Sequence, residues 1–411
     1  MSLFSLRKDT ERIGTIIDIG SGSVLVAIVV SKNSKTEPTI VWSHREHAPL
    51  RNIESIEQSA KSVLTALVNA LLKFDGEGRR ELYEYNKVRK IPEVQCCISA
   101  PWSYTVTKSI NYLQDKEFDV TRNLVDELIR TAEQKITEEL RGSDSAASLG
   151  LTVVARQTMD ILANGYRVEN PYNQKAKELS LSHASVVTQS YLVKELEQLQ
   201  EKIFPASVFH KISHILAFYS VSKEILPSSF DTCLIDITYE ATEIGIIRDG
   251  SLRYATHIPF GSFSLAREIS SITSIPLHEA FQNLHTEEPY EFIKNLSESQ
   301  RDDVEKVFEA YTQRLTDLFR ETGDELSIPK QILLHVDLKS EPFFSSMIER
   351  AAKRVLKSDP KITLTTAAIL KNSFPDFLKN SAHNDPNVDT GMLLSVLFFH
   401  KQKLDASFEY L

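Results

Sequence analysis

A short polar turn near the start of the chain has the composition of a phosphate-binding loop. The apolar run 13–17 leads into Asp18-Ile19-Gly20-Ser21-Gly22-Ser23, and a second apolar run, 24–30, follows at once. This pattern predicts a strand, a tight turn and a second strand. Because the turn is rich in glycine and serine, its backbone N–H groups and hydroxyls could point at phosphate oxygens.

A second turn of the same kind lies just past the middle of the chain. Leu234-Ile235-Asp236-Ile237 ends an apolar run, as Ile16-Ile17-Asp18-Ile19 does, and a further apolar run starts at 243. Two aspartates from two such units could hold a hydrated magnesium ion between them. The alternative is that each aspartate caps the end of its strand, which is common in turns. The repeated context leaves both interpretations open.

The duplicated unit predicts two similar lobes, with a cleft between them where the loops at the strand ends converge. In the first unit, a third strand at 39–42 precedes a helix that Asn52 caps. The apolar residues of this helix keep the three- and four-residue spacing of one buried face: Ile53, Ile56, Ala60, Val63, Leu64, Leu67, Val68, Leu71 and Leu72. The second unit is predicted to contain strands at 232–236, 243–247, 253–258 and 331–336, with helices at 264–322 and 341–355.

A compact α+β segment interrupts the first unit. The charged stretch 75–90 is interpreted as a linker. Beyond it the sequence predicts a helix that Thr121 caps and four strands, at 94–99, 106–113, 151–161 and 179–188. From Gln189 the chain returns to helix, strand and helix, ending near Leu226.

The bulk composition is that of a reduced, water-soluble protein. The net charge of -9 argues against broad binding to nucleic acid or anionic lipid. The three cysteines form no CxxC motif, which is typical of the cytosol. The longest apolar run, 392–399, is too short to span a bilayer. We expect it to form a buried closing helix, the alternative being an interfacial membrane helix.

Histidines offer a weak metal signal. His210 and His214 are spaced to share one face of a helix, but no cysteine or carboxylate cluster lies near them in the sequence. We therefore expect both to be ordinary surface or core residues, as for His44 and His47.

Together these motifs resemble the actin-like ATPase superfamily. The resemblance is carried by Asp18-Ile19-Gly20-Ser21, by Asp236-Ile237-Thr238 with Thr242, and by Ile258-Pro259-Phe260-Gly261. The insertion narrows the resemblance to the bacterial FtsA and PilM group, since 164–172 is similar to an FtsA segment and the start of the chain to PilM. It implies an α/β, two-lobed, ribonuclease H-like fold with an inserted SHS2-type α+β domain.

The resemblance also implies domain boundaries. They place the first lobe at 1–87 and 190–227, the insertion at 88–189, the second lobe at 228–390 with a helical subdomain at 264–325, and a closing helix at 391–411 that packs on the first lobe.

The implied nucleotide site would bind ATP, with Asp18 and Asp236 holding Mg²⁺ through water. Its other members would be Gly20, Ser21, Gly22, Ser23, Thr238, Thr242 and Gly261. The sequence departs from the family where glycines or a basic residue are usual: at Ser23-Val24-Leu25, Thr238-Tyr239, Gly261-Ser262 and Val336-Asp337. A bulky tyrosine should obstruct the close approach of a phosphate to the backbone. We therefore expect ATP binding to be weak or lost.

The function implied is that of a cytoplasmic scaffold of FtsA type, which would join membrane machinery to a cytoplasmic assembly in cell division. Its partner would be the tubulin-like ring protein, with self-polymerisation. One alternative is a PilM-like role in type IV pilus assembly, with the cytoplasmic tail of an inner-membrane protein as partner. Another is a slow ATPase of the same fold. FtsA proteins end in a membrane helix, whereas only 401–411 follow the closing helix here, so any membrane association is expected to be peripheral and through partners.

Overall fold

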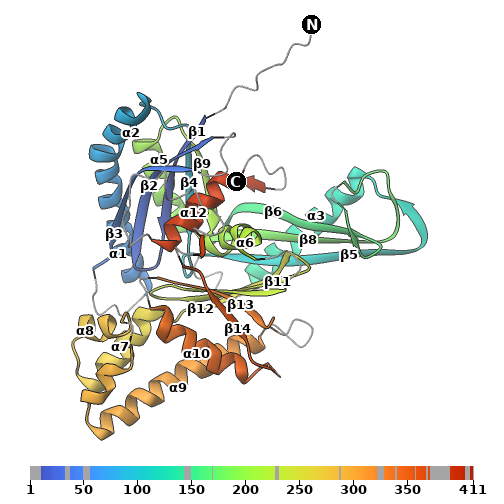
Figure 1. Cartoon of the computed structure of the whole chain (residues 1–411). Helices are drawn as coiled ribbons and strands as arrows, with labels where there is room; N and C mark the ends of the chain where they lie inside the picture. Colours follow the sequence, from blue (N-terminus) through green and yellow to red (C-terminus); the bar gives the residue numbers. More distant parts are fainter. Residues whose placement is uncertain are drawn as a thin grey trace.

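Two sheets of the same topology face each other across a pair of helices in the computed structural model of the chain (Figure 1). The first, sheet A, has the order β3 (Thr39–His47), β2 (Ser23–Lys32), β1 (Glu11–Ile19), β4 (Glu93–Ile98) and β9 (Val208–Ser213). The second, sheet C, has the order β12 (Ser251–Ile258), β11 (Thr242–Arg248), β10 (Thr232–Ile237), β13 (Gln331–Val336) and β14 (Lys361–Leu364). The structure describes residues 11–32, 38–49, 56–142, 150–168, 170–226, 231–286, 288–321, 328–337, 340–356, 358–366, 369–370, 389–402 and 408–410.

The predicted duplication is confirmed strand by strand. In each sheet the first three strands are antiparallel, and the central strand pairs in parallel with the next one. Asp18 and Asp236 are each the penultimate residue of a central strand, β1 and β10. Both strands are buried on both faces, as expected for strands covered by helices on either side. The two aspartates therefore lie at equivalent places in two equivalent lobes.

Helices α6 (His214–Ile225) and α12 (Thr390–Lys401) lie between the two sheets (Figure 1). Their apolar side chains join residues of both sheets in one buried cluster. Polar contacts also fix α12: Gln95 Nε2 donates to the Ser395 carbonyl at 3.0 Å, and the Ser31 hydroxyl is 2.7 Å from His400 Nδ1. The apolar run 392–399 is thus a buried helix.

Other helices cover the outer faces. Sheet A carries α1 (Ile56–Lys73), α2 (Arg79–Asn86) and α5 (Ser190–Ile203). Sheet C carries α7 (Ser262–Thr273), α8 (Leu277–Asn283), α9 (Glu298–Arg320) and α10 (Glu341–Lys353).

Two sequence-based expectations for the helices on sheet A need correction. On α1, Val68 and Leu72 are exposed at 43% and 64%, so the buried face is narrower than the apolar spacing predicts. The stretch 75–90 is no linker, because a π-helical turn at Phe74–Gly78 continues directly into α2. The predicted cap Asn52 lies outside the described residues.

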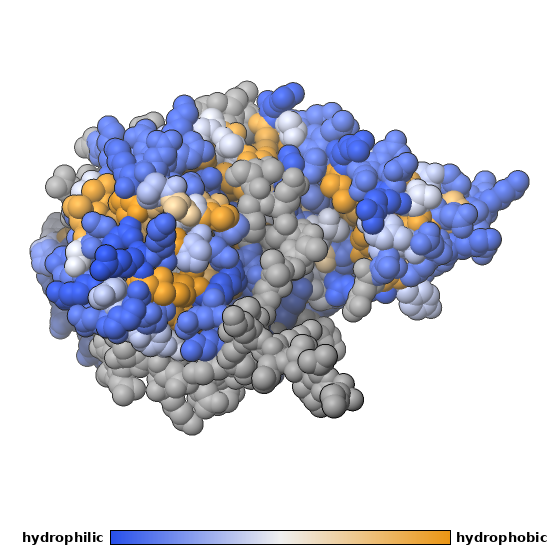
Figure 2. All heavy atoms as spheres, turned by 90° about the horizontal axis from the view of Figure 1, so that it is seen from above, coloured by the Kyte–Doolittle hydropathy of each residue, from blue (hydrophilic) through white to orange (hydrophobic). Residues whose placement is uncertain are grey.

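The inserted domain projects from the body, and its outer end is mostly hydrophilic in the view of Figure 2. Its sheet, sheet B, has the order β15 (Phe408–Tyr410), β6 (Leu151–Ala163), β8 (Lys175–Gln189) and β5 (Ser103–Asp119), with a short β7 (Tyr166–Arg167) beside β6. One helix, α3 (Arg122–Gly142), packs on this sheet. The strand predicted at 94–99 as part of the insertion is β4, which pairs with β1 in sheet A instead.

A buried carboxylate ties the inserted domain to the second lobe. The Asp160 side chain on β6 is 1% exposed, and its Oδ2 accepts hydrogen bonds from Arg253 Nη2 at 3.0 Å and Ser251 Oγ at 2.8 Å. Both donors lie on β12 of sheet C. Within the described ranges, no helix combines the length and apolarity needed to cross a membrane.

Candidate functional site: the cleft between the lobes

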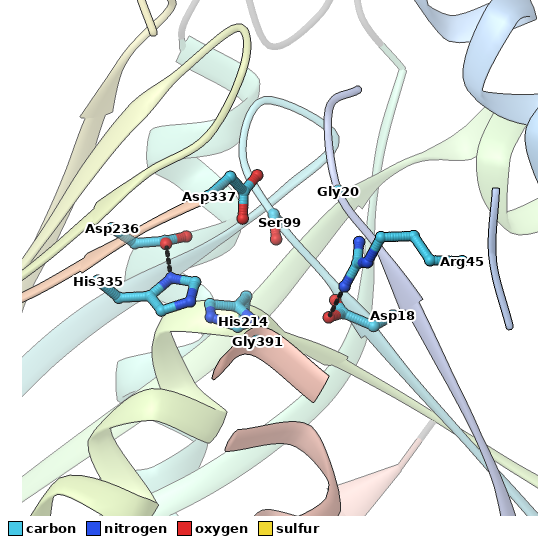
Figure 3. A pocket seen from close by; sticks show the side chains of 9 residues that line it. All are labelled: Asp18, Gly20, Arg45, Ser99, His214, Asp236, His335, Asp337 and Gly391. Atoms are coloured by element: carbon cyan, nitrogen blue, oxygen red, sulfur yellow. Dashed lines mark hydrogen bonds and ion pairs between the residues drawn. The ribbon is translucent and has the colours of Figure 1, made fainter. Parts of the chain in front are cut away.

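The ends of the central strands converge on a small enclosed space between the lobes (Figure 3). This cavity has a volume of about 10 Å³, which is about the room that one ordered water or one small ion needs. Both lobes and both intervening helices contribute to its wall, which consists of Asp18, Gly20, Arg45, Ser99, His214, Asp236, His335, Asp337 and Gly391.

An ion-pair network occupies the first-lobe side. Arg45 on β3 binds Asp389 through Nε, donates from Nη1 to Ser23 Oγ at 2.6 Å, and places Nη2 3.8 Å from Asp18 Oδ2. Burial raises the pKa of Asp18, although Arg45 opposes this shift. Burial also acts to raise the pKa of Asp389, but Arg45 and the Met392 N–H outweigh it, so this pKa lies below its ordinary value. Arg45 therefore holds the start of α12 against the first turn.

A histidine–aspartate pair occupies the second-lobe side. His335 Nδ1 lies 2.7 Å from Asp236 Oδ1, and the two residues are neighbours in the parallel register of β13 and β10. Burial acts to lower the pKa of His335, but the hydrogen bond and charge of Asp236 raise it to about 9. Burial opposes the charge on Asp236, yet His214 and His335 together lower its pKa. At neutral pH this is a buried pair of opposite charges.

Two further carboxyl groups crowd this side. Burial raises the pKa of Asp337 to about 7, and the negative charge of Asp236 adds to the shift while His335 opposes it. Glu243 faces Asp236 across the β10–β11 register and is 1% exposed. Burial, with Asp236 adding to it, raises the pKa of Glu243 well above its ordinary value, which favours the uncharged form of this group.

The two turns predicted to bind phosphate bond directly to each other. The Ser21 hydroxyl donates to Thr238 Oγ1 at 2.8 Å and accepts from the Glu240 N–H at 2.9 Å. The Tyr239 ring lies on Gly22, where an added Cβ would be 1.7 Å from Tyr239 Cδ2. Since Gly22 has no side chain, the ring can pack against the turn itself.

Among solved structures, the PilM-PilN type IV pilus biogenesis complex is similar to this chain over 95% of its length and 99% of the matched chain, with a TM-score of 0.57 and 11% identity. The chain has the actin-like ATPase fold. At this identity the likeness establishes the fold and not the activity. An ethanolamine utilization protein, EutJ of Carboxydothermus hydrogenoformans, is similar with a TM-score of 0.40 and 10% identity, over 86% of this chain and 84% of that one. No family model and no curated protein sequence matches the chain.

The actin-like lobes bring only part of the predicted nucleotide set to the cavity. Asp18, Gly20 and Asp236 line it. Thr242 points into the second lobe, where its hydroxyl donates to the Phe260 carbonyl at 2.8 Å. Gly261 is packed against the backbone of the second turn, since an added Cβ would lie 2.2 Å from the Thr238 carbonyl oxygen.

These residues do not fit a magnesium nucleotide in the arrangement seen. The Ser21 hydroxyl uses both its donor and an acceptor site within the protein, and the Gly20 N–H donates to the Ser23 carbonyl at 2.9 Å. Carboxylates of Asp18, Asp236 and Asp337 line a space too small for a phosphate chain. Because these carboxylates and a phosphate chain are both negative, the carboxylates would also repel a phosphate placed beside them.

Sequence reasoning missed several residues of the cavity. Arg45, Asp389 and His335 carry no motif, and their partners are far away in the sequence. His214 was expected to be an ordinary histidine without acidic neighbours, but the fold brings it beside Asp236 and His335. A correct in-register pairing of the runs at 232–236 and 331–336 would have placed Asp236 beside His335, but only the fold supplies that register.

Proposed function

We propose that this chain is a non-hydrolysing adaptor with an actin-like fold, which works by binding proteins rather than by turning over ATP. The observation that carries the proposal is the direct hydrogen bond between Ser21 and Thr238, with Tyr239 packed on Gly22. The two turns would have to separate to admit a phosphate chain, but they are hydrogen-bonded to each other. Opening them would leave buried hydroxyls unpaired, at a cost of about 1–3 kcal/mol for each group.

The charge around the cavity supports the same proposal. Four carboxyl groups lie at the cavity or beside it: Asp18, Asp236, Asp337 and Asp389. Arg45 and His335 are already paired with Asp389 and Asp236. A nucleotide would therefore bring further negative charge to an acidic site with no unpaired cation on its described wall.

We infer that the partner is a protein at the inner membrane. The PilM-PilN complex supports a PilM-like role, in which the chain binds the cytoplasmic part of a membrane protein and stays peripheral to the membrane. An FtsA-like role in cell division would use a cytoplasmic ring protein instead. The two roles predict different partners, so the partner decides between them.

Two measurements test the proposal. Isothermal titration with ATP and Mg²⁺ should give no heat of binding at millimolar ATP. Tight binding that Asp18→Ala and Asp236→Ala each abolish would refute the proposal and favour a slow ATPase. Cross-linking in native cells followed by mass spectrometry should then recover inner-membrane pilus proteins. Recovery of division proteins would assign the adaptor to the division machinery.

A further inference from the structure

Three potential metal ligands from separate elements meet at the centre of the molecule. His214 is the first residue of α6, Asp236 is the penultimate residue of β10, and His335 lies on β13. One ligand atom from each lies within 4.8 Å of the others, and all three residues are buried. Figure 3 shows the His214 and His335 rings beside each other, with the Asp236 carboxylate next to them.

His214 is an unexplained buried polar group. The residue is 2% exposed, and neither ring nitrogen has a hydrogen-bond partner among the described residues. Asp236 Oδ2 also lacks a partner there, although Oδ1 is bonded to His335. Buried polar atoms nearly always have a hydrogen-bond partner or a ligand, because leaving one without a partner is destabilising. The unpaired atoms therefore point to a ligand that completes this site.

The size and chemistry of the space restrict that ligand. The cavity volume of about 10 Å³ admits one water or one ion and no organic molecule. A single water could bond to some of these atoms but would add no charge, whereas Asp18, Asp236 and Asp337 make the wall acidic. A divalent cation would bind the unpaired atoms of His214 and Asp236 and would take the place of the proton on His335. Its charge would also reduce the repulsion among the acids.

Two imidazoles and one carboxylate form a donor set for Zn²⁺ and related first-row ions, whereas Mg²⁺ and Ca²⁺ prefer oxygen ligands alone. We propose that His214, Asp236 and His335 bind one such transition-metal ion directly, without nucleotide. Bonds of about 2.0 Å in a tetrahedral site place ligand atoms about 3.3 Å apart, so binding would draw α6 and sheet C together. The ion would join an interlobe helix, α6, to the second lobe.

The proposal is tested on the untagged full-length chain, stripped with a chelator and titrated with Co²⁺ or Zn²⁺. We expect one ion per chain, a visible Co²⁺ absorption band and a higher unfolding temperature. His214→Leu removes a ligand but breaks no hydrogen bond, so the variant should stay folded and should lower the affinity by about 100-fold or more. His278→Gln alters an exposed histidine on α8 and should bind the metal like the parent.

Three results would overturn the proposal: no binding by the parent, undiminished binding by a folded His214→Leu chain, or equal stabilisation by Mg²⁺ without nucleotide. Should His214→Leu unfold, His335→Gln takes its place, with circular dichroism as the check on folding. These outcomes are independent of the ATP titration, because no nucleotide is present in any of them.

Discussion

Replacing Gly22 by alanine should separate the two turns that close the cleft. The backbone at Gly22 needs no left-handed conformation, so the effect comes from the new methyl group alone. That group would lie 1.7 Å from Tyr239 Cδ2, far inside contact distance. The ring cannot swing away, because Tyr239 is 3% exposed and packs on Phe281 with ring centroids 5.0 Å apart. Forced overpacking of this kind costs about 1–3 kcal/mol, and we expect the upper end here.

The cost should disappear when the ring is removed. In a Tyr239→Ala background, Gly22→Ala should be neutral or slightly stabilising, which gives a coupling energy of about 2–3 kcal/mol between the two sites. Urea unfolding followed by tryptophan fluorescence is a suitable assay, since Trp102 Nε1 donates to the Gly20 carbonyl at 3.1 Å and reports on this turn. Gly76→Ala is the matched control: its Cβ would meet no atom within 4 Å, so stability should hold or rise. Equal costs of Gly22→Ala with and without the tyrosine ring would refute the reasoning.

Three further outcomes are expected. Ser21→Ala should lower stability by about 1–3 kcal/mol, because Thr238 and the Glu240 N–H lose their shared hydrogen-bond partner. Ser271→Ala, on the exposed side of α7, is the control in the same urea assay. Asp160→Ala should lower the free energy of unfolding by about 3–5 kcal/mol, because Arg253 stays partly buried without its partner. Hydrogen exchange in β6 should become faster as the inserted domain loosens. Unchanged exchange would contradict this link between the domain and the second lobe. Burial lowers the pKa of His183 from 6.5 to about 4, with Arg156 adding to the shift, so the unfolded chain binds more protons between these values. Stability should therefore be lost as pH falls from about 6.5 towards 4, by up to about 3 kcal/mol, and a His183→Leu chain that kept the same slope would contradict this.

The elements that carry a strong local signal could be predicted from the sequence. The runs ending at Asp18 and Asp236 are apolar and bounded by turn residues, so both central strands and their equivalence were visible. The Tyr239 ring lies on the first turn at Gly22. That it obstructs a phosphate there, as its bulk suggests, stays a prediction. Helix α2 was missed because Leu82 is its only buried residue, which leaves no apolar periodicity to detect.

Most of the cavity wall was beyond local sequence reasoning. Strand β4 was recognised as a strand, but nothing in 94–99 says that it pairs with β1 rather than with the insertion. Likewise, His214, Asp236 and His335 meet because three elements cross at one point, and the sequence separations between them carry no spacing rule. Buried ion pairs such as Arg45 with Asp389 depend on the same long-range geometry.

The closing helix has a consequence for the order in which the protein is made. Arg12 at the start of β1 donates to the Phe399 carbonyl at 2.7 Å, and Ser31 on β2 contacts His400. Strands β1 and β2 thus leave the ribosome well before α12, the helix that covers their inner face. Sheet B is completed later still, when β15 pairs with β6. Until α12 has been synthesised, the apolar inner faces of β1 and β2 stay open to solvent, and we expect a nascent chain of this protein to depend on chaperones for that interval.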